Sequence, residues 1–362
     1  MTDLEKARLL INDADKEMAR LFEQRMDAVR MVAAYKKEHG VPVDDFAREE
    51  EMIKRNSADI ASEEYRSYYV SFLRSVIDLS KNMQHRLLDG MRVAYSGVEG
   101  AFANIVAQRI FPDATCVPCS DFKAAYDAVV DGKCDCALLP VENSFNGDVG
   151  KVMDLAFFGS LFVTGVYEAE IVQNLLGVKG ATLDEVKQVI SHPQALGQCA
   201  AYISKHGFQS VEAVNTAVAA KQVAELGRHD IAAIGSEEAG IKFGLSKLEG
   251  HINESSSNTT RFAVFSRAQK AYSKKDNHFI MLFTVKNAAG FLGRAVSVIG
   301  EHGFNLRALK SRPTKDLIWE YYFYAEGEGD IGSEEGKAML KELKECCSSL
   351  KILGSFEKEI KL

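Results

Sequence analysis

The chain has 362 residues, 46% of them hydrophobic and 26% charged, so we expect a globular protein of two or three domains. A net charge of -7 argues against nucleic acid as the main partner, because binding to a phosphate backbone requires a clustered basic surface. No stretch approaches the roughly 18 apolar residues of a membrane span, and the first residues lack the pattern of a signal peptide. We therefore expect a cytoplasmic protein with no membrane partner.

Seven cysteines is an odd number for a disulfide framework, and a cytosolic chain keeps its cysteines reduced. Cys116 and Cys119, with Cys134 and Cys136, are the only spacing that resembles a zinc site. Both pairs lie in apolar, strand-like runs without a suitably spaced histidine, which favours buried free thiols. We expect no metal and no cofactor.

Residues 3–38 contain neither proline nor glycine, and apolar residues recur in them at helical spacing. A helix of that length spans roughly 50 Å, so it must be covered by partner helices or by a second chain. Three cations, Arg8, Arg25 and Lys36, interrupt the apolar stripe. Buried cations need internal carboxylates or an anionic ligand; at the edge of a helix bundle their charged ends would instead reach water.

A shorter helix follows, in which Asp45, Arg48 and Glu49 share one face. A third helix, from about residue 62 to residue 87, has Ser80 and Gln84 on its apolar stripe. This order of long, short and long helices resembles the all-α chorismate mutase domain, a dimer of interlocked helices. We assign residues 1–90 to that domain.

The resemblance implies a Claisen rearrangement of chorismate to prephenate, which needs neither a nucleophile nor a cofactor. Arg8 from the partner subunit and Arg25 would hold the two carboxylates. Lys36 and Gln84 would meet the negative charge on the breaking ether oxygen. By resemblance the catalytic residues are Arg8, Arg25, Lys36, Glu49 and Gln84, and the substrate-binding residues are Asp45, Arg48 and Ser80.

From residue 91 short apolar runs alternate with amphipathic segments, which is typical of an α/β domain with a mainly parallel sheet. Two such sets follow each other. We assign one lobe to residues 91–168 plus 242–268 and the other to residues 169–241. Lobes in tandem usually close on a ligand between them.

Candidate chemistry lies where the predicted strands end. Asn143 follows one strand, Ser191 follows another and precedes a helix that contains Gln198, and the run from Asn258 to Phe262 opens a third. A helix N-cap explains Ser191 equally well, and a solvated polar turn is the simplest interpretation of the run at Asn258.

Together these motifs resemble prephenate dehydratase, over residues 91–268, with a two-lobed fold like that of periplasmic binding proteins. That family expels the ring hydroxyl and carboxylate of prephenate, giving phenylpyruvate, water and carbon dioxide. The resemblance implies that Thr260 donates a proton to the leaving hydroxyl. Asn143, Ser191 and Gln198 would orient the substrate, and Arg261 would attract a carboxylate or brace the loop.

Two positions depart from that family's pattern. Ala101 replaces a usual Ser or Thr, and Asn215 stands where a Ser usually precedes Thr216, so we expect fewer hydroxyls in the pocket. His192 could serve as a general acid, but we interpret it as a packing residue at a helix start.

Residues 277–362 read as strand, helix, strand, strand, helix, strand, with the third strand predicted at residues 317–324. This βαββαβ order is ferredoxin-like and resembles an ACT domain, which binds an amino acid at a dimer interface. Lys310 replaces a usual Glu of the family motif. The resemblance implies that phenylalanine binds at Gly290, Phe291, Leu292, Asn305, Ser311, Arg312 and Pro313.

The whole chain resembles the bifunctional chorismate mutase/prephenate dehydratases of phenylalanine biosynthesis. The resemblance implies chorismate and prephenate as substrates, phenylalanine as an allosteric inhibitor, and a homodimer or homotetramer. Two alternatives remain. Arogenate dehydratase applies the same chemistry to the amino analogue, and a non-catalytic regulatory protein could bind a small ligand between the two lobes.

Overall fold

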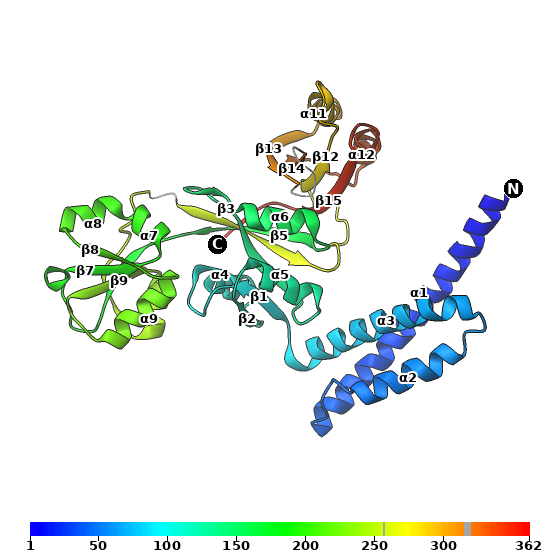
Figure 1. The fold of residues 1–362 in the computed structure, drawn as a ribbon, viewed down its shortest axis with the longest axis horizontal. Coiled ribbons are helices and arrows are strands. Elements are labelled where there is room, and N and C mark those ends of the chain that lie inside the picture. The colour runs from blue at the N-terminus through cyan, green and yellow to red at the C-terminus, as the bar shows by residue number, and fades with distance from the viewer. Residues whose placement is uncertain (256–257, 315–319) are drawn as a thin grey trace. The chain divides into compact units, whose positions relative to one another are not determined.

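The computed structural model describes residues 1–255, 258–314 and 320–362 (Figure 1). It separates into two compact units, Met1–Arg92 and Val93–Leu362. Across the described residues, no helix is long and apolar enough to cross a membrane.

The first unit consists of helices α1 (Asp3–His39), α2 (Phe46–Ala58) and α3 (Glu63–Asp89). Thr2 and Glu5 form a capping box at the start of α1, and Gly40 ends the helix with φ 65°. Only Val29 and Ala33 of α1 are buried, so its packing on α3 is confined to its C-terminal half. The N-terminal half extends beyond the other two helices (Figure 1).

The first sheet of the second unit has the order β16-β5-β11-β3-β1-β2, and β4 pairs with β3. The expected parallel pairing holds for β1 and β3, but β11 is antiparallel to both β3 and β5, so the sheet is mixed. Its strands are β1 (Arg92–Ser96), β2 (Thr115–Cys119), β3 (Cys136–Asn143), β4 (Gly147–Asp148), β5 (Phe162–Glu170), β11 (Thr259–Ser266) and β16 (Ile360–Lys361), and its helices are α4 (Phe102–Ile110), α5 (Phe122–Val130) and α6 (Gly150–Phe158).

The second sheet has the order β10-β6-β9-β7-β8. Its elements are β6 (Asn174–Gly177), β7 (Gln188–Ser191), α7 (Pro193–Gln198), α8 (Ala200–His206), β8 (Gln209–Glu212), α9 (Thr216–Leu226), β9 (Ile231–Gly235), α10 (Glu237–Phe243) and β10 (Ser246–Glu249). We expected residues 242–268 in the first lobe, but β10 pairs antiparallel with β6. The chain therefore returns to the first sheet only at β11, because β10 completes the edge of the second sheet.

The C-terminal sheet has the order β13-β14-β12-β15, with antiparallel neighbours. Its elements are β12 (His278–Thr284), α11 (Phe291–Glu301), β13 (Asn305–Pro313), β14 (Tyr321–Glu328), α12 (Glu334–Cys346) and β15 (Ser349–Phe356). Residues 317–319 of the predicted third strand lie outside the described residues. Ala295 and Leu343, from the two helices, pack on one face of this sheet. Leu282 and Leu353, on the other face, join the core of the first sheet.

Candidate active sites

The helical unit contains an open pocket of about 330 Å³ that is lined by residues from all three helices. Among the eight polar positions expected at the mutase site, seven line it: Arg25, Lys36, Asp45, Arg48, Glu49, Ser80 and Gln84. Arg8 does not. It precedes Arg25 by 17 residues on the same helix, a separation of about 26 Å.

Hydrogen bonds fix the cations of this pocket. Arg25 Nη1 donates to Ser80 Oγ and to the carbonyl of Val76 (3.3 Å), and burial lowers the pKa of Arg25. Lys36 Nζ donates to the carbonyl of Val43 at 2.8 Å. Both cations are thereby held at the pocket wall, where they can meet an anionic ligand.

Asp45 and Gln84 have different surroundings. The Asp45 carboxylate caps α2 by accepting from the backbone N–H of Arg48 at 3.1 Å. Gln84 is buried, and its Nε2 donates to the carbonyl of Ser80 at 3.4 Å. Its Oε1 has no partner among the described residues, so one end of this amide is left for a bound molecule.

Lys81 is a pocket residue that sequence reasoning missed. Its ammonium lies 2.9 Å from Asp44 and 3.1 Å from Glu49, and the side chain is 19% exposed. Lys81 precedes Gln84 by three residues, so both lie on one face of α3. That spacing could have identified it.

A second cavity, of about 240 Å³, lies between the two α/β lobes. The first lobe contributes Ala101, Phe102, Asn143, Thr260 and Phe262, the second contributes His192, Gln194, Ala195, Gln198, Val214, Asn215 and Thr216, and the connecting segment contributes Ile171 and Gln173. Three residues expected at the dehydratase site, Asn143, Gln198 and Thr260, are thus brought together.

Asn143 organises one side of this cavity. Its Oδ1 accepts from the backbone N–H groups of Phe145 (3.1 Å) and Asn146 (3.0 Å). Because backbone N–H groups can only donate, this fixes the orientation of the amide. Its Nδ2 then donates to Thr260 Oγ1 at 2.9 Å and to Asn258 Oδ1 at 3.0 Å.

Asn258, which sequence reasoning did not select as a site residue, connects the two lobes. It is only 2% exposed, and its Nδ2 donates to Gln198 Oε1 at 3.1 Å. Gln198 Oε1 also accepts from Gln173 Nε2 at 3.4 Å. A chain of buried amides therefore runs from Thr260 to Gln198. Asn258 belongs to the polar run that opens β11, and its amide side chain could have identified it as a site residue.

Ser191 and Arg261 lie outside the cavity wall formed by the described residues. Ser191 is fully buried, and its hydroxyl donates to the carbonyl of Ile234 at 2.6 Å, which ties β7 to β9. It is not the N-cap of α7, because the helix begins at Pro193, two residues after Ser191. His192 is the cap, with its Nδ1 accepting from the N–H of Gln194 at 3.2 Å.

Arg261 follows Thr260 in β11 and therefore points to the opposite face of the strand. Its guanidinium pairs with Glu142 (2.7 Å), Glu326 (2.8 Å) and Glu359. Burial opposes its charge, but these carboxylates outweigh burial and raise the pKa of Arg261. The structure thus gives Arg261 three protein carboxylates and no access to the cavity.

Two family models match the two units. Residues 7–85 match chorismate mutase type II, and residues 93–270 match prephenate dehydratase. A bifunctional chorismate mutase/prephenate dehydratase of Enterobacter agglomerans is 30% identical over 369 residues, which cover 96% of this chain and 94% of that protein. The chain belongs to the bifunctional chorismate mutase/prephenate dehydratase family. It is an enzyme of phenylalanine biosynthesis with both catalytic domains.

Other relatives extend this similarity. The bifunctional enzyme of Aquifex aeolicus is 29% identical, with 99% of each chain covered. An arogenate dehydratase/prephenate dehydratase of Arabidopsis thaliana is 31% identical, covering 74% of this chain and 72% of that protein. The solved prephenate dehydratase of Arthrobacter aurescens in complex with L-Phe has a TM-score of 0.68 and 24% identity, covering 74% of this chain and 90% of that chain. At that identity it shows the shared fold.

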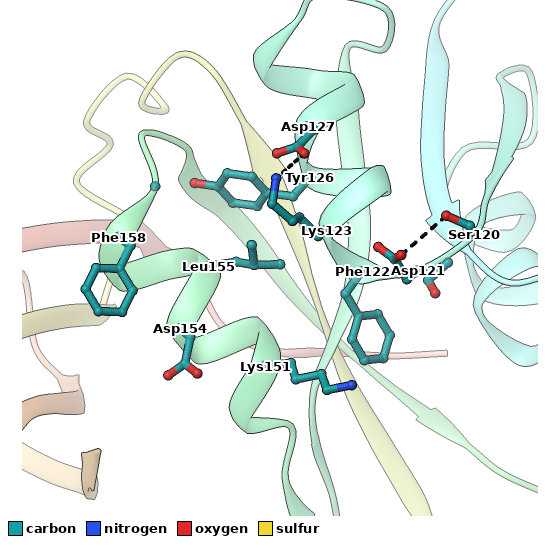
Figure 2. A pocket seen from close by; sticks show the side chains of 12 residues that line it. Ser120, Asp121, Phe122, Lys123, Tyr126, Asp127, Lys151, Asp154, Leu155 and Phe158 are labelled. Carbon is teal, nitrogen blue, oxygen red and sulfur yellow. Dashed lines mark hydrogen bonds and ion pairs between the residues drawn. The ribbon is translucent and has the colours of Figure 1, made fainter. Parts of the chain in front are cut away.

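A larger cavity of the dehydratase domain, about 670 Å³, lies between α5 and α6. Figure 2 shows Lys151 and Phe122 on its wall, with Phe158 further along α6. Asn143, Gln198 and Thr260 are not among its described lining residues. The residues expected at the dehydratase site therefore line the smaller of these two cavities.

The residues expected to bind phenylalanine lie on α11 and β13. Gly290 adopts φ 86° and caps α11, directly before Phe291 and Leu292. Asn305, Ser311 and Pro313 are on the exposed side of β13. Arg312 is on the other side and forms two hydrogen bonds to the carboxylate of Asp154 in α6 (2.8 and 3.0 Å). In this structure Arg312 therefore contacts the dehydratase domain.

Proposed function

We propose that the helical pocket performs the chorismate mutase reaction and the cavity between the α/β lobes performs the dehydratase reaction. The observation that carries this assignment is the separation of two polar residue sets into two pockets, each in its own compact unit. Each pocket holds the residue types that its reaction needs.

In the mutase pocket, catalysis rests on positioning and charge. Arg25 binds one carboxylate of chorismate and favours the folded conformer in which the reacting carbons meet. Lys36 donates to the ether oxygen, where negative charge grows as the bond breaks, and so does the Gln84 Nε2 hydrogen that does not bond to the Ser80 carbonyl. The ring hydroxyl donates to Glu49 or to Asp45, while Arg48 and Ser80 complete the polar contacts.

A second copy of the chain supplies Arg8 to this pocket. Leu4, Ile11 and Met18 recur every seven residues beside Arg8 on α1, and they are 60%, 59% and 49% exposed. Such a stripe needs an apolar partner. In a symmetric dimer each α1 could place Arg8 at the partner's pocket, which the 26 Å helical separation prevents within one chain.

Mixing two inactive variants tests this arrangement. Arg8→Ala and Arg25→Ala each disable every mutase site of their own homodimers. A mixed dimer contains one site with both arginines, so random mixing restores about a quarter of the wild-type mutase activity in a symmetric dimer. If the mixture has no more activity than its components, Arg8 is not shared between chains.

In the dehydratase cavity, Thr260 is the proton donor. Its oxygen accepts from Asn143, so its own hydrogen is free to bond to the ring hydroxyl of prephenate. The bond from the ring to the carboxylate breaks to release carbon dioxide, and its electron pair aromatises the ring as the carbon–oxygen bond breaks. The leaving hydroxide takes the proton from Thr260 and departs as water. Solvent then returns a proton to the threonine.

Gln198 orients the substrate, and Asn143 holds the Thr260 hydroxyl in place for it. The hydrogen bonds from Gln173 and Asn258 both go to Gln198 Oε1, which leaves the amide hydrogens of Gln198 for a carboxylate or the keto group of prephenate. For Arg261 and Ser191 we propose bracing roles. Arg261 holds the carboxylates of neighbouring strands, and Ser191 keeps β7 in register with β9.

The C-terminal domain is proposed to be an ACT domain that binds phenylalanine and inhibits the dehydratase. Its βαββαβ order and antiparallel sheet support this assignment, as does the L-Phe complex of the Arthrobacter enzyme. Calorimetric titration with phenylalanine, with tyrosine as the control ligand, measures it. Binding that survives the change Ser311→Ala combined with Gly290→Ala would place the effector site elsewhere.

Two variants test the two-site assignment on one chain. Arg25→Ala should abolish conversion of chorismate and spare conversion of prephenate, and Thr260→Ala should do the reverse. Both variants should be given arogenate as well, since a relative is named for both dehydratase activities. Loss of both activities from either folded variant contradicts two independent sites.

A further inference from the structure

A lysine of the C-terminal domain holds the hairpin that carries Asn143. Lys310 in β13 donates to Glu142 Oε1 at 2.9 Å and to Asp148 Oδ1. Glu142 and Asp148 face each other across the β3–β4 pair. One ammonium therefore bridges both strands of this hairpin, and its side chain is 17% exposed.

The Glu142 carboxylate is held from two sides. Lys310 binds Oε1, and Arg261 binds Oε2 at 2.7 Å. Burial opposes ionisation, but the hydrogen bonds from Lys310 and Arg261 outweigh it and lower the pKa of Glu142. A partly buried carboxylate bound by two cations has a preferred position.

Glu142 directly precedes Asn143, and the turn of the hairpin is gripped by Asn143 itself through Phe145 and Asn146. Contacts that fix the positions of Glu142 and Asp148 therefore also fix the Asn143 amide, which donates to Thr260 Oγ1. Groups held only about 1 Å from their productive place can lose roughly 100-fold in rate. A shift of this hairpin should therefore change the rate of the dehydratase reaction.

Lys310 stands on the half-buried side of β13, while its neighbours Leu309 and Ser311 are exposed. It thus points toward the dehydratase domain, away from the side that holds the proposed effector residues Asn305, Ser311 and Pro313. We propose that Lys310 is a positioning residue of the dehydratase reaction, acting through Glu142, Asp148 and the β3–β4 hairpin on Asn143. This rests on the proposed roles of Asn143 and Thr260.

The test compares Lys310→Met and Lys310→Arg in the full chain, with prephenate as substrate and no phenylalanine. We expect Lys310→Met to lower the dehydratase kcat roughly 10- to 100-fold with less than a threefold change in KM. Lys310→Arg restores most of kcat, because a guanidinium can also bridge two carboxylates. The mutase Vmax of the same preparations measures the amount of folded helical unit and stays constant.

Lys344→Met is the matched control, because Lys344 is an exposed lysine of α12 in the same domain; it leaves both activities unchanged. A double-mutant cycle with Glu142→Gln tests whether Lys310 acts through Glu142. If Lys310 acts through Glu142, the double variant loses little more kcat than the worse single variant. Additive losses overturn the proposal, as does a Lys310→Met kcat within twofold of wild type.

Thr260→Ala in the same assay separates this proposal from the site assignment. If Thr260→Ala is inactive and Lys310→Met is fully active, the positioning role alone is wrong. If Thr260→Ala keeps the wild-type kcat, the assigned cavity is wrong and the proposal falls with it.

Discussion

Replacing Asn258 by alanine should remove the hydrogen bonds by which this side chain connects the two dehydratase lobes. Its side chain makes three hydrogen bonds to described residues: it accepts from Asn143 and donates to Gln198 Oε1 and to the carbonyl of Ile171. Alanine removes all three and leaves three partners in a site that is 2% exposed.

The expected cost follows from these contacts. Each buried hydrogen bond contributes about 1 kcal/mol net, and partners left without water cost somewhat more, so the free energy of unfolding should fall by about 3 kcal/mol. For a unit of this size each kcal/mol shifts Tm by about 2–4 °C. We therefore expect the transition of the dehydratase unit to fall by roughly 6–12 °C.

Calorimetry of the full chain, with prephenate kinetics on the same samples, measures both effects. Asn277→Ala is the control, because this exposed asparagine contacts only the adjacent His278 among the side-chain bonds of the described residues. Asn258→Asp keeps the shape and the bond from Asn143 but cannot donate to Gln198. We expect it to lose as much dehydratase activity as alanine. A Tm within 1 °C of wild type for Asn258→Ala, with unchanged kcat, would refute the reasoning.

Three further predictions concern packing and charge. Gly354→Ala should destabilise the second unit by about 1–3 kcal/mol, measured by thermal unfolding, because its Cβ would lie 1.9 Å from the carbonyl of Val163; Gly293→Ala, with open space around it, is the control. Hydrogen bonds to Glu342 and Glu335 raise the pKa of His302, so its stabilising effect is complete below about pH 6.5 and disappears as the pH rises through the folded-state pKa. Tm of His302→Gln should thus be lower than wild type at pH 5.5 and equal to it at pH 9. Lys81→Met should lower the mutase kcat/KM, measured with chorismate, and leave the dehydratase unchanged, since Lys81 holds Glu49.

Local sequence patterns predicted the helices and strands better than they predicted which strands pair with each other. The absence of proline and glycine from residues 3–38 predicts α1, and Gly40 ends it at φ 65°. The pairing of β10 with β6 was missed, because a strand of four residues contains no information about its distant neighbour. The antiparallel place of β11 between β3 and β5 likewise depends on pairing between segments that lie far apart in the chain.

The candidate sites divide in the same way. Helical spacing brought Arg25, Lys36, Ser80 and Gln84 to one pocket, because residues on one face of a helix stay together whatever the helix packs against. Arg261 could have been excluded from the substrate cavity by the period of two in a strand, since Thr260 already points there. The place of Ser191 depended on β9, which no local pattern locates.

The register of β11 on β3 explains how one strand serves two purposes. Thr260 pairs with Asn143, and the next residue, Arg261, pairs with Glu142. Successive side chains point to opposite faces, so the first pair faces the cavity and the second faces the C-terminal sheet. Glu326 of that sheet and Lys310 both bind the second pair. A displacement of the C-terminal sheet must therefore either move Arg261 and Glu142 or break their bonds to Glu326 and Lys310. Arg261 directly follows the proposed proton donor, Thr260. If an effector shifts this sheet, these contacts alone connect the shift to Thr260.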